Sequence, residues 1–176
     1  MLNLPHFRDN LRKIMPKTRE SSNAAVLDRN DRKILRMLQA DGRMTNAEMA
    51  RKLHMSPAAC HRRTQRLFAD GYVERVAARV AAPLVERGTL VFVGVVVDRS
   101  TPETFSAFEA AIRALPLVLD CHLVAGDFDY ILKIRVRDIA DFNRIHSARL
   151  ITVPGVRQTR TFFVLKEVVD GAPLDF

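Results

Sequence analysis

Cysteine is scarce in this chain of 176 residues, where Cys60 and Cys121 are the only two. They lie far apart and match no zinc-ligand spacing, so the sequence predicts neither a disulfide framework nor a zinc site. Long apolar runs are also lacking, since no stretch reaches the roughly 18 residues that a membrane-spanning helix needs. The first residues lack the apolar core of a secretion signal. We therefore expect a soluble, cytoplasmic protein, and no motif indicates a cofactor.

Basic residues are plentiful, but they are unevenly distributed along the chain. The net charge is +8, and hydrophobic residues make up 48% of the sequence, which is enough for a packed core. Residues 1–88 carry 18 Lys and Arg against 9 Asp and Glu, whereas residues 89–176 carry 10 against 11. Because Lys and Arg displace counterions from phosphates, the excess points to a polyanionic partner of the first half. A solvated basic surface is the alternative that charge alone leaves open.

Turn-forming residues and changes of periodicity divide the chain into five segments. Residues 1–26 form a basic extension, which we interpret as a flexible tail in preference to a DNA-contacting arm. We expect a helical domain over 27–82, a linker over 83–88, a second domain over 89–170 and a tail over 171–176. The sequence thus predicts two small domains.

The first domain shows the pattern of a helix-turn-helix. Predicted helices cover 28–39, 46–53 and 57–69, and a short strand pair follows over 72–75 and 77–80. Thr45 and Glu48 form a capping box at the start of the second helix. Ser56 caps the third helix, and Pro57 occupies its first turn. The turn between these two helices is only a few residues long, which is the spacing of a helix-turn-helix whose second helix enters the major groove of DNA.

The outer face of the third helix is polar and basic. Together with its cap, this face comprises Ser56, Ala58, His61, Arg62, Arg63, Gln65 and Arg66. Arginines contact phosphates or guanine edges, while His and Gln reach base edges. Arg62 and Arg66 stand four residues apart and repel one another unless an anion lies nearby. The pattern favours DNA as the partner, with a winged helix that binds other proteins as the alternative.

The second domain alternates strands and helices. Predicted strands cover 90–97, 118–124, 130–136 and 156–165, and predicted helices begin at Pro102 and cover 139–150. The order β-α-β-β-α-β is the ferredoxin-like pattern, so the fold class of the whole chain is α+β. In the second of these helices, Ile139, Phe142 and Ile145 are expected to face the core.

Landmark residues occur in a fixed order along both halves of the chain. They include Leu27-Asp28, Asp31, Asn46-Ala47-Glu48, Ser56, Cys60, Arg62-Arg63, Gly71, Cys121-His122, Gly126, Asp129-Tyr130 and Pro154-Gly155-Val156. In this order they resemble the leucine-responsive regulator/AsnC (Lrp/AsnC) family over about residues 27–170. The resemblance implies a transcriptional regulator with a winged helix-turn-helix that binds operator DNA. It also implies a ferredoxin-like regulation-of-amino-acid-metabolism (RAM) domain that forms homodimers and higher assemblies of dimers.

The resemblance further implies an effector, an amino acid or related metabolite, bound between subunits near the loop after the second strand. Mapped onto this chain, the candidate residues are Ala125, Gly126, Asp127, Asp129 and Tyr130. Asp127 or Asp129 can pair with an α-ammonium group. A structural role is equally open, in which the loop is a simple turn, Asp129 caps local backbone and Tyr130 packs against a neighbouring subunit. Ala125 stands where many family members have Thr or Ser, so the identity of the effector stays open.

An enzyme is the alternative class. Sirohaem decarboxylases share this two-domain architecture and modify a tetrapyrrole, a role in which His122 and Arg135 would be candidates. No nucleophile–base pair or metal cluster is recognisable in the sequence, and the basic third helix is what a DNA-binding protein needs. We therefore expect a regulator that is not an enzyme.

Overall fold

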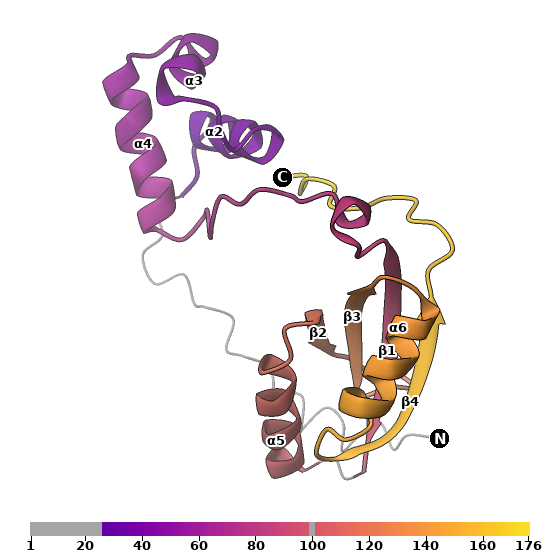
Figure 1. Cartoon of the computed structure of the whole chain (residues 1–176). Coiled ribbons are helices and arrows are strands. Elements are labelled where there is room, and N and C mark those ends of the chain that lie inside the picture. The colour runs from indigo at the N-terminus through magenta and orange to yellow at the C-terminus, as the bar shows by residue number, and fades with distance from the viewer. Residues whose placement is uncertain (1–25, 99–100) are drawn as a thin grey trace. The chain divides into compact units, whose positions relative to one another are not determined.

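The computed structural model describes residues 26–98 and 101–176, which separate into two units (Figure 1). The first unit contains the described residues up to 77 together with 172–176, and the second contains residues 78–171. The first unit holds α2 (Arg29–Ala40), α3 (Asn46–Leu53) and α4 (Pro57–Ala69). The second holds η1 (Ala82–Val85), β1 (Thr89–Val97), α5 (Pro102–Arg113), β2 (Val118–Leu123), β3 (Tyr130–Val136), α6 (Ile139–Ile145), η2 (His146–Leu150) and β4 (Val156–Phe163). No helix of the described residues is long and apolar enough to cross a membrane.

The helices of the first unit begin where their caps predict. The Asp28 side chain accepts from the backbone N–H groups of Asn30 and Asp31 at the start of α2. The capping box of Thr45 and Glu48 is formed at α3, and the Ser56 hydroxyl accepts from the Ala59 N–H at α4. The helices pack around a small apolar core of Ile34, Leu35, Met49, Ala50, Leu53, Cys60 and Leu67. The predicted helix-turn-helix is confirmed.

The strand pair predicted after α4 is wrong, because none of residues 72–80 is in a strand. The two halves of the expected hairpin belong to different units. Val76 lies against Gly42 in the first unit, where a Cβ on the glycine would come within 2.8 Å of the valine Cγ1. Arg79 instead forms an ion pair with Asp170 in the second unit. Each half of the expected hairpin therefore contacts its own unit, and the two halves do not pair as strands.

The units also divide the chain at positions that differ from the expected boundaries. The sequence placed a linker at 83–88, whereas the units separate between residues 77 and 78, and Ala82–Val85 forms a short 3₁₀ turn of the second unit. The tail predicted at 171–176 also differs, since residues 172–176 pack with the helices of the first unit. The chain therefore passes between the units twice.

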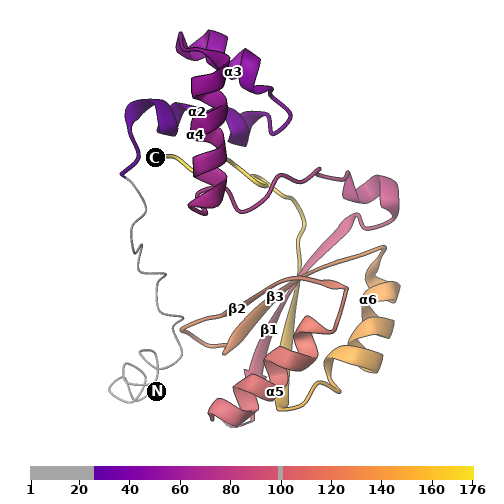
Figure 2. The ribbon, with the colours of Figure 1, turned by 90° about the vertical axis from the view of Figure 1, so that its left-hand side faces the viewer.

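The second unit is a four-stranded antiparallel sheet in the order β2-β3-β1-β4. One face is apolar because Val91, Val93 and Val95 of β1 lie opposite Ile134, Leu132 and Tyr130 of β3, and all six are buried. Helices α5 and α6 cover this same side of the sheet (Figure 2). The arrangement confirms the ferredoxin-like β-α-β-β-α-β fold and the α+β class.

The second helix of this unit is shorter than the sequence predicts. It ends at Ile145, and the next five residues, His146–Leu150, form a π-helical turn. Phe142 is buried as expected, but Ile139 is 59% exposed. The reason is that Asp138 caps the helix, so Ile139 is its first residue and lies at the helix end. The last strand ends at Phe163 instead of residue 165.

Candidate DNA-binding and effector sites

Helix α4 turns its apolar side inward and leaves the opposite side open. Cys60, Thr64 and Leu67 are buried, and the Thr64 hydroxyl bonds to the Cys60 carbonyl. The residues left exposed on the open side are Ser56, Ala58, His61, Arg62 and Gln65. Within the described part of the chain, the Arg62 side chain forms no hydrogen bond or ion pair, so its guanidinium is available to a phosphate or a guanine.

His61 is held at the junction of the two helices of the motif. Its Nδ1 lies 3.2 Å from the Nδ2 of Asn46, the first residue of α3. The Oδ1 of Asn46 is buried and has no hydrogen-bond partner among the described residues. This contact fixes the imidazole while the residue itself stays exposed, which suits a side chain that reaches a base edge.

Arg63 and Arg66, which were predicted to face DNA, are instead bound to acids of α2 and its cap. Arg63 Nη1 lies 2.5 Å from Asp28 Oδ2 and 2.9 Å from Asp31 Oδ1. Arg66 Nη2 is paired with Asp31 Oδ2. Asp31 is only 1% exposed. Of the neighbouring pair Arg62 and Arg66, only Arg66 is thus neutralised by an acid of the protein itself, Asp31.

The acid–arginine cluster of Asp28, Asp31, Arg63 and Arg66 shifts the ionisation of its members. A hydrogen bond from the Asp31 N–H, and then the Arg63 guanidinium, hold the pKa of the Asp28 carboxyl below its usual value. The same carboxylate, followed by Asp31, raises the pKa of Arg63. The cluster joins the start of α2 to the middle of α4, so Arg63 and Arg66 hold α4 against α2. Two acids three residues apart, one at the N-cap and one in the first turn of α2, were the sequence signal for this role.

The candidate effector loop has a bound end, which is hydrogen-bonded to β1, and an open end, which is exposed to solvent. At the bound end, the Asp129 carboxylate accepts from the Val97 N–H at 2.8 Å, and its backbone N–H donates to the Val95 carbonyl at 2.9 Å. Asp129 therefore caps the backbone of β1, which is the structural alternative for this residue. At the open end, Ala125, Gly126 and Asp127 are exposed.

Tyr130 lies in the core of its own unit, away from any surface. Its side chain is 1% exposed, and its ring lies 4.5 Å from that of Phe108, centroid to centroid. Its hydroxyl donates to Glu109 Oε1 at 3.0 Å, and burial raises the pKa of the phenol. This placement contradicts both the effector contact and the contact with a neighbouring subunit that the sequence suggested. Residues along β3 alternate between buried and partly buried, and Tyr130 is on the buried side of this pattern.

Phe128 positions the loop, a role that sequence reasoning did not assign to it. A Cβ added to Gly94, in the middle of β1, would come within 2.7 Å of three carbons of the Phe128 ring. The ring therefore lies directly over the glycine backbone. A glycine inside a buried strand often marks such a close approach, so Gly94 was the signal that could have found this contact.

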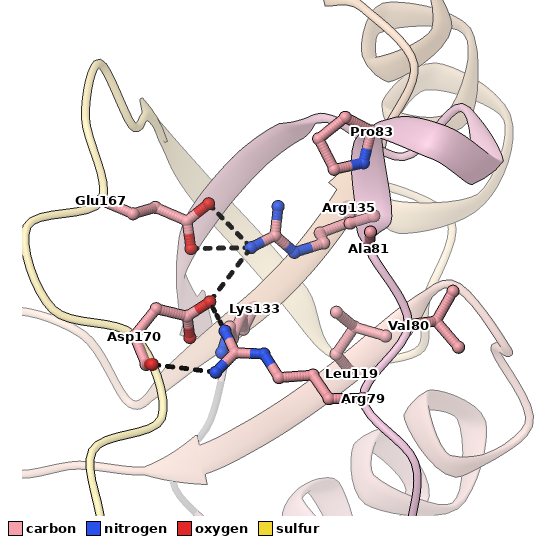
Figure 3. A pocket seen from close by; sticks show the side chains of 10 residues that line it. Arg79, Val80, Ala81, Pro83, Leu119, Lys133, Arg135, Glu167 and Asp170 are labelled. Carbon is pink, nitrogen blue, oxygen red and sulfur yellow. Dashed lines mark hydrogen bonds and ion pairs between the residues drawn. The ribbon is translucent and has the colours of Figure 1, made fainter.

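A charged cleft of about 440 Å³ lies on the second unit between the 79–83 segment, β3 and residues 167–170 (Figure 3). Arg135 Nη2 bonds to both carboxylate oxygens of Glu167, at 2.7 and 2.8 Å, and this pair lowers the pKa of Glu167. Arg79 is paired with Asp170. Arg135, a candidate for the enzymatic alternative, is thus already committed to an internal ion pair. Among the described residues no group of acids, cysteines and histidines could hold a metal ion.

Comparison with known proteins also gives two domains. Residues 27–74 match the family model of a winged helix-turn-helix DNA-binding domain, and residues 90–174 match that of the Lrp/AsnC ligand binding domain. The chain is 40% identical over 142 residues to the leucine-responsive regulatory protein of Salmonella typhimurium, which covers 81% of this chain and 87% of the relative. It is 39% identical, with the same coverage, to that of Escherichia coli K12.

Solved structures agree with these relatives. A transcriptional regulator from Neisseria meningitidis, solved as a complex with L-Met, has a TM-score of 0.80 at 34% identity and covers 85% of this chain and 98% of its own. An AsnC family regulator from Agrobacterium tumefaciens has a TM-score of 0.80 at 30% identity, with coverage of 85% and 97%. From its helix-turn-helix, its ferredoxin-like sheet and these matches, the chain belongs to the Lrp/AsnC family of transcriptional regulators, which combine a DNA-binding and a ligand-binding domain.

Proposed function

We propose that this chain recognises operator DNA through the open side of α4, and that an amino acid or related metabolite bound between subunits by the ligand-binding domain changes its affinity for DNA. The proposal rests on one observation about the outward side of α4. Arg62 is unpaired there within the described residues, while Arg63 and Arg66 are bound to acids of α2 and its cap. The regulator acts in the cytoplasm, where its DNA lies.

The proposed DNA contacts form a smaller set than the sequence suggested. Arg62 contacts phosphate or guanine, His61 and Gln65 reach base edges, and Ser56 and Ala58 let the helix approach the groove closely. Arg63 and Arg66 act as positioning residues through Asp31. Each dimer places two such helices in successive major grooves, so the operator is a pseudo-palindrome.

The proposed effector contacts lie at the open end of the loop. Asp127 is exposed there and can pair with an α-ammonium group, and the backbone N–H groups of Ala125 and Gly126 can hold a carboxylate. A Cβ at Gly126 would meet nothing within 4 Å, so the backbone is accessible to a ligand. A relative solved with L-Met and relatives named for leucine support an amino acid as the ligand class.

Homodimers form, in this proposal, through the second unit. The sheet face opposite α5 and α6 carries partly exposed apolar side chains, among them Phe92, Phe128, Ile131 and Phe162. The Phe128 and Phe162 rings lie 6.0 Å apart in an edge-to-face arrangement. Burying an aromatic cluster of this kind against a second copy stabilises a dimer.

The test is the affinity of the full chain for a labelled duplex from upstream of its own coding sequence, compared with a shuffled duplex of the same length. At physiological salt a sequence-specific regulator binds the first at least about a hundredfold more tightly. Equal affinities for both duplexes would contradict the proposal. A thermal-shift screen of the amino acids, with particle size measured in parallel, then identifies the effector and its influence on assembly.

A further inference from the structure

The segment Ala172–Phe176 forms a specific contact with α2. The Gln39 side-chain amide forms two hydrogen bonds with the backbone of Leu174. Its Oε1 accepts from the Leu174 N–H at 2.8 Å, and its Nε2 donates to the Leu174 carbonyl at 3.2 Å. A primary amide that pairs with both groups of one residue reproduces the pairing of a neighbouring strand. The Leu174 side chain itself is 76% exposed, so recognition runs through the backbone.

Phe176 provides the apolar anchor of the same segment. It packs against the core cluster of the helix-turn-helix, beside Leu27, Leu35 and Leu38, and lines a groove of about 720 Å³ with them. The guanidinium carbon of Arg36 lies 5.7 Å from the centre of the Phe176 ring, and Arg36 Nη2 also donates to the Phe176 carbonyl. One aromatic ring and three hydrogen bonds therefore fasten this segment to a single helix.

The residues just before the segment are held within the second unit. Arg79 Nη1 donates to the Asp170 carbonyl at 2.9 Å, and its guanidinium is paired with the Asp170 carboxylate. Gly171 follows with a φ of +66°, a left-handed conformation that favours glycine, and it separates the two attachments. The chain is thus held within the second unit as far as Asp170, and within the first unit from residue 172 onward.

We propose that residues 172–176 are an internal docking peptide whose binding site is the α2 surface formed by Arg36, Gln39 and the groove under Phe176. Helix α2 carries this site and also Asp31, which holds Arg63 and Arg66 of the recognition helix. The segment therefore gives the effector domain a second connection to the helix that orients α4. This regulatory role rests on the proposed function, whereas the docking itself does not.

Hydrogen exchange of the full chain, followed by mass spectrometry, tests the docking without DNA. We expect the α2 amides to exchange about tenfold faster in Phe176→Ala and in Gln39→Ala. Each variant removes one of the two contacts, the Phe176 ring or the Gln39 amide, that fasten the segment to α2. Gln39 is exposed, so the Gln39→Ala variant folds even if Phe176→Ala does not. Leu165→Ala is the matched control, since Leu165 is 99% exposed. Unchanged α2 exchange in both variants overturns the proposal.

A DNA titration with and without the amino acid found in the screen tests the regulatory role. We expect both variants to bind DNA but to lose most of the effector-induced change in affinity that Leu165→Ala retains. A full effector response in variants with faster α2 exchange overturns the regulatory role. If the unmodified chain shows no preference for its upstream DNA, the proposed function fails, and the docking is still decided by exchange.

Discussion

Asp31 is the buried acid that joins α2 to both Arg63 and Arg66 of α4. Its Oδ2 accepts from the Asp28 N–H at 3.1 Å as part of the capping box, and its two oxygens bind Arg63 and Arg66. The carboxylate is almost fully buried, whereas the arginine side chains are 30% and 37% exposed. Removing the charge leaves Arg66 without its nearest partner and Arg63 with Asp28 alone, and breaking such a buried pair is destabilising.

Asp31→Asn is expected to destabilise the first unit by about 2 kcal/mol, a value between those of exposed and fully buried pairs. Thermal or denaturant unfolding of the full chain measures the change. Asp41→Asn is the control, because Asp41 is exposed at the other end of α2 and an asparagine can still accept from the Arg43 N–H. Equal stabilities of the two variants would show that the acid–arginine cluster does not hold α4.

Asp28 gives the first unit an acid-sensitive component. Its folded-state pKa lies below the ordinary 3.8, so the ionised form stabilises the fold above about pH 4, and this contribution is lost as the pH falls through the folded pKa. In Asp28→Asn the cap is kept but the titration is gone. The melting temperature of this variant should therefore fall less steeply between about pH 5 and about pH 2.5. Parallel curves for the two proteins would rule out this contribution.

Among the elements, β1 is shaped by its contact with residues 125–129, the candidate effector loop. Gly94 lies under the Phe128 ring, and Asp129 bonds to the backbone of the same strand at Val95 and Val97. We expect Gly94→Ala to displace the Phe128 ring and with it residues 125–127, so that the effector-induced thermal shift falls sharply. Gly88→Ala is the control, since its Cβ would meet Pro83 at an ordinary 3.6 Å. A normal effector shift in Gly94→Ala would contradict this role of Phe128.

Local signals predicted the elements well, and long-range contacts explain the failures. Thr45, Ser56 and Pro57 fixed the bounds of α3 and α4, because caps act on the residues next to them. The strand pair after α4 failed because its halves follow different units, which no local pattern records.

For the candidate sites too, the sequence predicted local features and missed long-range contacts. Periodicity identified the outward side of α4, but it could not show that Arg63 and Arg66 turn back to residues more than thirty positions away. Likewise, the family position of Tyr130 suggested an effector contact, whereas packing placed it against Phe108.

For the whole molecule, the division of charge predicts how DNA binding responds to salt. The basic half contains α4, and the other half is close to neutral. Raising the salt from about 50 to about 200 mM should lower the affinity for DNA at least tenfold, because counterions released on binding must be displaced against a higher concentration. The effector-induced thermal shift should change little over the same range. An affinity independent of salt would argue against phosphate contacts by the basic half.

The central claim is that α4 reads DNA with its open side while its inward arginines fix its position. The affinity of the full chain for its upstream duplex, measured for Arg62→Ala and Arg63→Ala beside their melting temperatures, tests this claim most directly. We predict that Arg62→Ala weakens binding by about 1–3 kcal/mol at an unchanged melting temperature, whereas Arg63→Ala lowers the melting temperature. Wild-type affinity in Arg62→Ala, together with wild-type stability in Arg63→Ala, would contradict the account.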